Sequence, residues 1–160
     1  LSGLRAAGRK EHKMAETVLI KEVAARDGLQ AQPQHLTVAQ RLDLLAALAK
    51  TGVPELEIGS FVSPKAIPQM AGTDEIAANL PETTAAYSAL VPNMKGYELA
   101  LATGIKTYAI AISATEQMNQ NNIKKSLEDT FLMAEDIGLF LPSIIITLIT
   151  CCWLPGLMDS

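Results

Sequence analysis

The sequence is poor in the residues on which several functional classes depend. Only two of its 160 residues are cysteines, and these are the neighbours Cys151 and Cys152. Adjacent cysteines cannot join distant segments and do not have the spacing of a zinc knuckle, so a reducing compartment fits best. A formal net charge of −4 provides no basic surface for DNA or RNA. The composition therefore excludes a disulfide framework and argues against nucleic-acid binding.

Histidine is equally rare, and the balance of residue types is that of one globular domain. The two histidines, His12 and His35, form no pair with metal-ligand spacing, and we interpret both as surface residues. Apolar residues make up 49% of the chain and charged residues 19%, which is typical of a folded chain with a buried core.

The first thirteen residues, LSGLRAAGRKEHK, are basic and show no apolar period. We interpret residues 1–13 as a leader or non-native segment, because Met14 begins a plausible native start. A basic start with little acid also occurs in mitochondrial transit peptides. The bacterial cytoplasm is the preferred location, and the mitochondrial matrix stays open as the alternative.

From residue 17 onward, short apolar runs alternate with segments of helical period. The pattern predicts strands at 17–23, 55–61, 84–91 and 107–112, and helices at 37–52, 73–80, 93–104 and 121–136. Thr37 and Gln40 have capping-box spacing, Asn93 is the expected N-cap of its helix, and Gly52 and Gly104 are the expected terminators. This alternation predicts an α/β fold with a parallel sheet, whose chemistry collects at the carboxyl ends of the strands.

The first such strand end carries Arg26, Asp27 and Gln30, with Gly28 giving the chain its turn. A carboxylate there is a hard oxygen ligand suited to Mg²⁺ or Mn²⁺. A guanidinium beside it can hold a developing oxyanion through paired N–H donors. The alternative is a solvated surface turn, because turns favour Asp and Gly in any case.

The next two strand ends also offer polar groups. Glu55 and Glu57 alternate with apolar neighbours and are expected on one face of their strand, where Glu57 could accept a proton or reach a metal-bound water. Ser60 follows at the end of that strand. Asn93 and Lys95 begin the helix after the third strand, where backbone amides favour an anion. An exposed strand with a Ser-Pro turn, and a simple N-cap at Asn93, are the alternatives.

Four segments of the sequence resemble a known family: EVAARDGLQ, SFVSPKAIPQM, LVPNMKGYELA and SATEQMNQNNIKKSLED. In this order and spacing they closely resemble the 3-hydroxy-3-methylglutaryl-CoA lyases, over about Val18 to Glu135. The SFVSPKxxPQM run is specific to that branch. Arg-Asp-Gly after the first strand is also similar to the wider group of metal-dependent lyases and synthases, including isopropylmalate and homocitrate synthases.

The resemblance implies a TIM-barrel fold, (β/α)8, that binds Mg²⁺ or Mn²⁺ and cleaves a CoA thioester into acetyl-CoA and acetoacetate. By similarity, Asp27 is a metal ligand and Arg26 stabilises enolate charge. Gln30, Glu57 and Ser60 then belong to the pocket, with Glu57 near the water network of the metal, and Asn93 contacts the substrate. Lys95 would attract the phosphates of CoA, an inference from its charge alone.

The chain also departs from the family pattern. A complete barrel of this kind has about 250 residues, and this sequence supplies only the first four to five βα units. The His-x-His pair and the cysteine in a Gly-rich loop that the family uses have no counterpart here. We therefore expect this chain alone to be inactive and to self-associate. Two alternatives remain: a non-catalytic fragment that binds itself or a full-length lyase, and a synthase of the isopropylmalate or homocitrate type.

Residues 138–160 form an apolar tail that does not resemble the family, which we expect to occupy residues 14–137. The tail has no charged residue between Asp136 and Asp159. Its centre predicts a buried parallel strand at 143–150. A membrane helix is the less favoured alternative, because prolines lie near both ends and no basic residue flanks the run. A frameshift or an unspliced junction is the origin that we favour for this tail.

Overall fold

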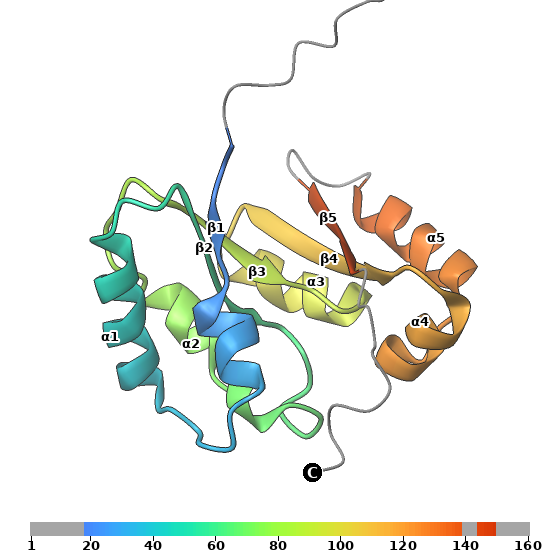
Figure 1. Cartoon of the computed structure of the whole chain (residues 1–160), viewed down its shortest axis with the longest axis horizontal. Coiled ribbons are helices and arrows are strands. Elements are labelled where there is room, and N and C mark those ends of the chain that lie inside the picture. Colours follow the sequence, from blue (N-terminus) through green and yellow to red (C-terminus); the bar gives the residue numbers. More distant parts are fainter. Residues whose placement is uncertain (1–17, 139–143, 150–160) are drawn as a thin grey trace, which may run out of the picture.

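Five parallel strands form one sheet in the order β1-β2-β3-β4-β5 in the computed structural model, which describes residues 18–138 and 144–149 (Figure 1). The strands are β1 (Lys21–Glu22), β2 (Glu55–Ser60), β3 (Ala86–Leu90), β4 (Thr107–Ser113) and β5 (Ile144–Ile149). Each strand pairs with the next one in the chain. The predicted α/β fold with a parallel sheet is therefore present.

The helices lie between consecutive strands, as parallel connections require. They are α1 (Val38–Ala49), α2 (Thr73–Ala78), α3 (Met94–Ala102), α4 (Glu116–Ile123) and α5 (Leu127–Gly138), with a π-helical turn η1 (Ala24–Gly28) and a 3-10 turn η2 (Pro68–Met70). The predicted helix ends are confirmed where a capping residue or a glycine marks them. Thr37 and Gln40 form the capping box of α1, and Gly52 and Gly104 have φ of 78° and 81°.

The two faces of the sheet have different chemistry, because alternate residues of a strand point to opposite sides. The helix-facing side is apolar, and Ile58, Ala89 and Ile110 pack there against Leu45 and other helix residues in one core. On the opposite, inner face, Glu57 is paired in register with Ser88, and Ser88 with Thr107. Polar groups are thus gathered on the inner face.

The single helix predicted at 121–136 is wrong, because the chain forms α4 and α5 with a sharp break between them. Lys124 has the left-handed φ of 58°, which ends α4. The backbone N–H of Asp129 donates to Oγ of Ser126 (3.0 Å), which starts α5. The buried side chain of Asn119 donates to the carbonyls of Lys125 and Ser126 and holds the break in place.

The first strand is also shorter than predicted. Only Lys21–Glu22 joins the ladder, and Val18, Leu19 and Ile20 before it are 84%, 80% and 61% exposed. The turn expected at Gly28 is a helical one, since η1 begins directly after Val23.

The apolar run near the end of the chain contains β5, which pairs with β4 from Tyr108 to Ser113. A strand was the structure predicted for its centre, and the observed bounds are Ile144–Ile149. Within the described residues, no helix is long and apolar enough to cross a membrane. The leader at 1–13 and the rest of the tail lie outside the described residues.

Candidate functional site

The turn η1 places two charged residues at the carboxyl end of β1. The backbone N–H groups of Arg26, Asp27 and Gly28 all point at the carbonyl of Val23, at N–O distances of 3.1, 2.7 and 3.4 Å. Ala25 is buried beneath the turn. The side chain of Arg26 reaches the neighbouring strand β2, where its Nε donates to Glu57.

Arg26 and Asp27 belong to a chain of five alternating charges on the inner face. Nη1 of Arg26 donates to Oδ1 of Asp27 (2.6 Å), and Nε donates to Oε1 of Glu57. The other oxygen of Glu57 lies 2.7 Å from Nζ of Lys21, which is also 3.1 Å from Oε1 of Glu55. The order Glu55–Lys21–Glu57–Arg26–Asp27 runs toward the strand end.

Burial differs along this chain and decides what each carboxylate can do. Glu57 is 2% exposed and has a cation on each oxygen, Lys21 on one and Arg26 on the other. Asp27 is 65% exposed, and within the described residues only its Oδ1 makes a hydrogen bond or ion pair. Glu57 therefore holds Arg26 in place, whereas Asp27 is open to solvent.

Three further side chains end in buried polar atoms. Gln30 Oε1, Ser60 Oγ and Ser88 Oγ are buried, and none of them has a hydrogen-bond partner in the part of the chain that the structure describes. Buried polar atoms without a partner are rare and need an explanation such as a water or a ligand. Gln30 and Ser60 were expected in the pocket from the sequence, whereas Ser88 was not.

The predicted residues of the third strand end lie at the start of α3, next to the end of β2. Asn93 accepts a hydrogen bond from the backbone N–H of Gly96 (2.9 Å) and so caps α3, while Lys95 is exposed. A Cβ on Gly96 would lie 2.7 Å from the carbonyl oxygen of Phe61, so the start of α3 packs directly on the end of β2. Within the described residues, no hydrogen bond joins Asn93 or Lys95 to Arg26 or Asp27.

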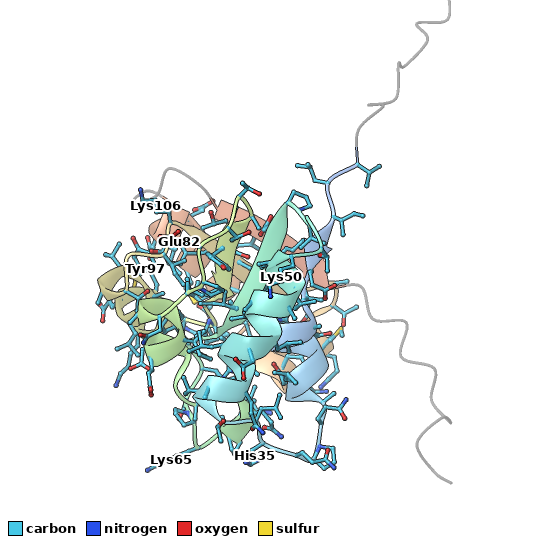
Figure 2. All side chains as sticks on the ribbon, turned by 90° about the vertical axis from the view of Figure 1, so that its left-hand side faces the viewer. His35, Lys50, Lys65, Glu82, Tyr97 and Lys106 are labelled. Carbon is cyan, nitrogen blue, oxygen red and sulfur yellow. The ribbon has the colours of Figure 1, made fainter. Side chains whose placement is uncertain are left out.

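The loops after β1 and β2 contact each other. Nε2 of Gln69 donates to the carbonyl of Gln32 (3.0 Å), which links the segment after η1 to the SFVSPKAIPQM loop. Figure 2 shows Lys65 of that loop and His35 at the same end of the molecule, with Lys106 and Glu82 at the opposite end. The structure thus gathers the loops that follow β1 and β2 at one end of the molecule.

Besides Ser88, the sequence did not predict roles for Lys21 and Arg41. Lys21 is the second cation on Glu57. Arg41 is 1% exposed beneath β2, and burial lowers its pKa. The signal for Lys21 was a lysine inside an apolar strand beside a strand with two glutamates. The helical period puts Arg41 on the face of Val38 and Leu45, but an arginine there is expected to extend its guanidinium into water.

The described residues do not by themselves make a cation site. No group of three or more His, Cys, Asp or Glu side chains with suitable spacing occurs among them. Asp27 can supply one oxygen ligand, and Glu57 is already neutralised by Lys21 and Arg26. Since a divalent cation such as Mg²⁺ needs about six ligands, this donor set is incomplete.

A family model described as HMGL-like matches residues 17–144. The chain belongs to the HMGL-like family. The match runs beyond Glu135, where the resemblance in the sequence was placed, and reaches Ile144, the first residue of β5. Together with the relatives and the solved structure described next, this match confirms the sequence resemblance to 3-hydroxy-3-methylglutaryl-CoA lyases.

Curated relatives of this chain are acyl-CoA lyases. The hydroxymethylglutaryl-CoA lyase of Pseudomonas mevalonii is 44% identical over 117 residues, which are 72% of this chain and 39% of that protein. The (R)-citramalyl-CoA lyase of Chloroflexus aurantiacus is 42% identical over 128 residues, 73% of this chain and 40% of that protein. A mitochondrial hydroxymethylglutaryl-CoA lyase from Rattus norvegicus is 36% identical. The chain thus spans about two fifths of these relatives.

A solved structure of a relative confirms the fold. The HMG-CoA lyase from Brucella melitensis superposes with a TM-score of 0.78 at 34% identity, over 87% of this chain and 52% of that one. The expected partial TIM barrel, with parallel strands in sequential order, is therefore confirmed for this HMGL-like chain.

Proposed function

We propose that this chain carries the first part of the active site of a 3-hydroxy-3-methylglutaryl-CoA lyase. The observation that carries the proposal is the buried Glu57 carboxylate, which holds Arg26 beside the exposed Asp27 at the carboxyl end of β1. This arrangement occurs in a chain whose relatives are acyl-CoA lyases of the same family.

The reaction separates acetyl-CoA from a ketone and places negative charge on the thioester. The tertiary hydroxyl loses its proton and becomes the ketone of acetoacetate, while the bond between C2 and C3 breaks. The bonding electron pair moves to the thioester as an enolate, and a proton added at C2 gives acetyl-CoA. Arg26 is the proposed donor to the enolate oxygen, because a preorganised cation stabilises charge that develops during the reaction.

The neighbouring residues have supporting roles in this proposal. Lys21 and Glu57 fix the guanidinium of Arg26, so that its remaining N–H groups face the substrate. Gln30 and Ser60 satisfy their buried polar atoms by hydrogen bonds to the substrate. Asn93 contacts the acyl part, and the exposed Lys95 attracts the CoA phosphates.

Asp27 is the proposed ligand of a divalent cation, Mg²⁺ or Mn²⁺. Such a cation, when bound, lowers the pKa of a coordinated hydroxyl and polarises a carbonyl oxygen. Asp27 is the only described residue that we assign to it, so the other ligands come from outside the described residues. For this reason we propose that the chain alone is inactive and that it self-associates or associates with a complete lyase.

The substrate class is a CoA thioester with a hydroxyl group at carbon 3. A relative named for (R)-citramalyl-CoA, at 42% identity, makes that thioester the second candidate substrate. Both substrates would release acetyl-CoA. Because relatives are bacterial and mitochondrial, the proposed location is the bacterial cytoplasm, with the mitochondrial matrix as the alternative.

An acetyl-CoA release assay tests this proposal. The chain is mixed, in the presence of Mn²⁺, with a separately purified segment of the Pseudomonas mevalonii lyase that covers the part this chain does not match. We expect release from 3-hydroxy-3-methylglutaryl-CoA by the mixture and none by the chain alone. Arg26→Met in this chain should abolish release, whereas Lys106→Met, at the opposite end of the molecule, should not (Figure 2).

The same assay separates the alternatives. Acetyl-CoA release from citramalyl-CoA, with none from 3-hydroxy-3-methylglutaryl-CoA, would make citramalyl-CoA the substrate. Thiol release from acetyl-CoA and a 2-oxo acid would indicate a synthase. A mixture that forms a stable complex without any turnover would support a non-catalytic binding fragment. Release that is insensitive to Arg26→Met would contradict the assigned role of Arg26.

A further inference from the structure

Arg41 is a buried cation that forms no ion pair within the described residues. It lies in α1 and is 1% exposed. Its guanidinium donates to the carbonyls of Ala71 (2.9 Å) and Ile58 (3.3 Å), and Nη2 also lies 3.5 Å from Oγ1 of Thr73. Burying an arginine without a carboxylate partner costs free energy. The position of Arg41 in the core therefore needs an explanation.

The strand that Arg41 contacts contains an irregularity. Along β2, Glu57 is paired with Ser88 and Ser60 with Leu90. Three steps along β2 thus correspond to two steps along β3, which is the signature of a β-bulge with one extra residue. In a regular strand, residues three apart point to opposite faces. Because of the bulge, Glu57 and Ser60 both point to the inner face.

Arg41 lies directly against this bulge. A Cβ built on Gly59 would be 2.7 Å from Nη2 of Arg41 and 2.7 Å from Oγ1 of Thr73, so only a glycine lets the guanidinium approach the strand this closely. The carbonyl of Ile58, inside the bulge, receives the Arg41 hydrogen bond. The contact with Ala71 ties the residue that directly follows the SFVSPKAIPQM segment to the same guanidinium.

We propose that Arg41 is a positioning residue that holds the bulge in β2, and thereby turns Ser60 to the same face of the sheet as Glu57. The cation acts through the carbonyls of Ile58 and Ala71 and does not touch the substrate. This inference goes beyond the proposed reaction, because it concerns the register of β2 and holds whichever acyl-CoA binds.

Disulfide trapping measures the register of β2 without any activity assay. Adjacent strands are about 4.8 Å apart, which lies within the range of Cα distances that a disulfide can bridge. Ser60→Cys with Leu90→Cys reports the bulged register, in which these two residues are paired. Leu90→Cys with Ala109→Cys reports the β3–β4 pairing, which does not involve the bulge. Cys151 and Cys152 are replaced by Ser to remove competing thiols.

Each cysteine pair is oxidised in three backgrounds: Arg41, Arg41→Lys and Arg41→Met. We expect Arg41→Met to lose the 60–90 disulfide and to keep the 90–109 disulfide, and Arg41→Lys to keep both. Lys50→Met, an exposed cation removed at the end of the same helix, should also keep both.

Three results would overturn the proposal. Retention of the 60–90 disulfide in Arg41→Met would show that the bulge does not need the cation. Loss of both disulfides would assign Arg41 to general stability of the sheet. Failure of the 60–90 pair to form with Arg41 present would show that β2 has another register.

Discussion

Gly59 is a residue at which the packing beneath β2 leaves no room for a side chain. A methyl group there would meet both Arg41 and Thr73 at 2.7 Å. We expect Gly59→Ala to lower the free energy of unfolding by about 1–3 kcal/mol, the usual cost of overpacking. Denaturant unfolding measures it.

Gly28→Ala is the matched control, because its Cβ would meet Ala24 at an ordinary 3.6 Å. Its effect should stay within about 0.5 kcal/mol, as for most uncrowded substitutions. Equal destabilisation by the two variants would mean that β2 and Arg41 are not in close contact.

Single residues also show where sequence analysis succeeds and where it stops. Arg26 and Asp27 could be found because they directly follow a predicted strand, and chemistry in parallel sheets gathers there. The ion pairs of Lys21 depend on its register with Glu55 on the neighbouring strand. A local sequence pattern does not contain that register. Arg41 shares a helix face with Val38 and Leu45, and its burial depends on acceptors supplied by Ile58 and Ala71. Functional roles for all of these residues remain predictions.

At the level of helices and strands, the break between α4 and α5 contains the only non-glycine residue of the described chain with a left-handed backbone, Lys124. An L-residue pays about 1–2 kcal/mol for that conformation, whereas glycine adopts it freely. We expect Lys124→Gly to raise the free energy of unfolding, because it removes this strain. The gain should be at most about 1 kcal/mol, because the larger entropy that glycine loses on folding offsets part of it.

Thermal unfolding compares Lys124→Gly with Lys125→Gly, the neighbouring substitution without a positive φ. The first should raise the melting temperature and the second should lower it or leave it unchanged. If both variants melt at the same temperature, Lys124 does not end α4 in the left-handed conformation.

Helix ends were predictable where their signals are local. Thr37, Asn93, Gly52 and Gly104 act on their own turns, and each does so as the sequence indicates. The α4–α5 break was missed because it depends on Asn119, whose side chain reaches carbonyls several residues away. The length of β1 was overestimated because apolar character alone does not supply a ladder partner for residues 18–20.

For the molecule as a whole, the exposed start of β1 predicts association. Val18, Leu19 and Ile20 offer a run of exposed apolar side chains beside an edge strand, a combination that favours pairing with another chain (Figure 1). Sedimentation should show species larger than the 17.1 kDa monomer. Leu19→Lys should reduce them, because charged residues protect strand edges.

Leu101→Lys is the control for that variant, since Leu101 is 54% exposed on α3, away from the edge. It should leave the distribution of sizes unchanged. A monodisperse monomer of the unaltered chain would contradict the association.

The overall architecture was predictable because alternation of apolar runs and amphipathic segments leaves few arrangements besides a parallel sheet. The polar inner face was not predictable in full. Glu57 could be assigned to a face from alternation, whereas Ser60 points to that face only because of a bulge that the sequence does not announce.

The most direct test concerns Asp27, which we propose as a cation ligand beside the Arg26–Glu57 pair. Backbone amide NMR signals are followed while Mn²⁺, whose unpaired electrons broaden nearby signals, is added to the chain. We predict that residues 26–30 broaden first, and that Asp27→Asn abolishes this selectivity while Asp74→Asn does not. Broadening centred on Asp74 and Glu75, or unchanged by Asp27→Asn, would contradict the account.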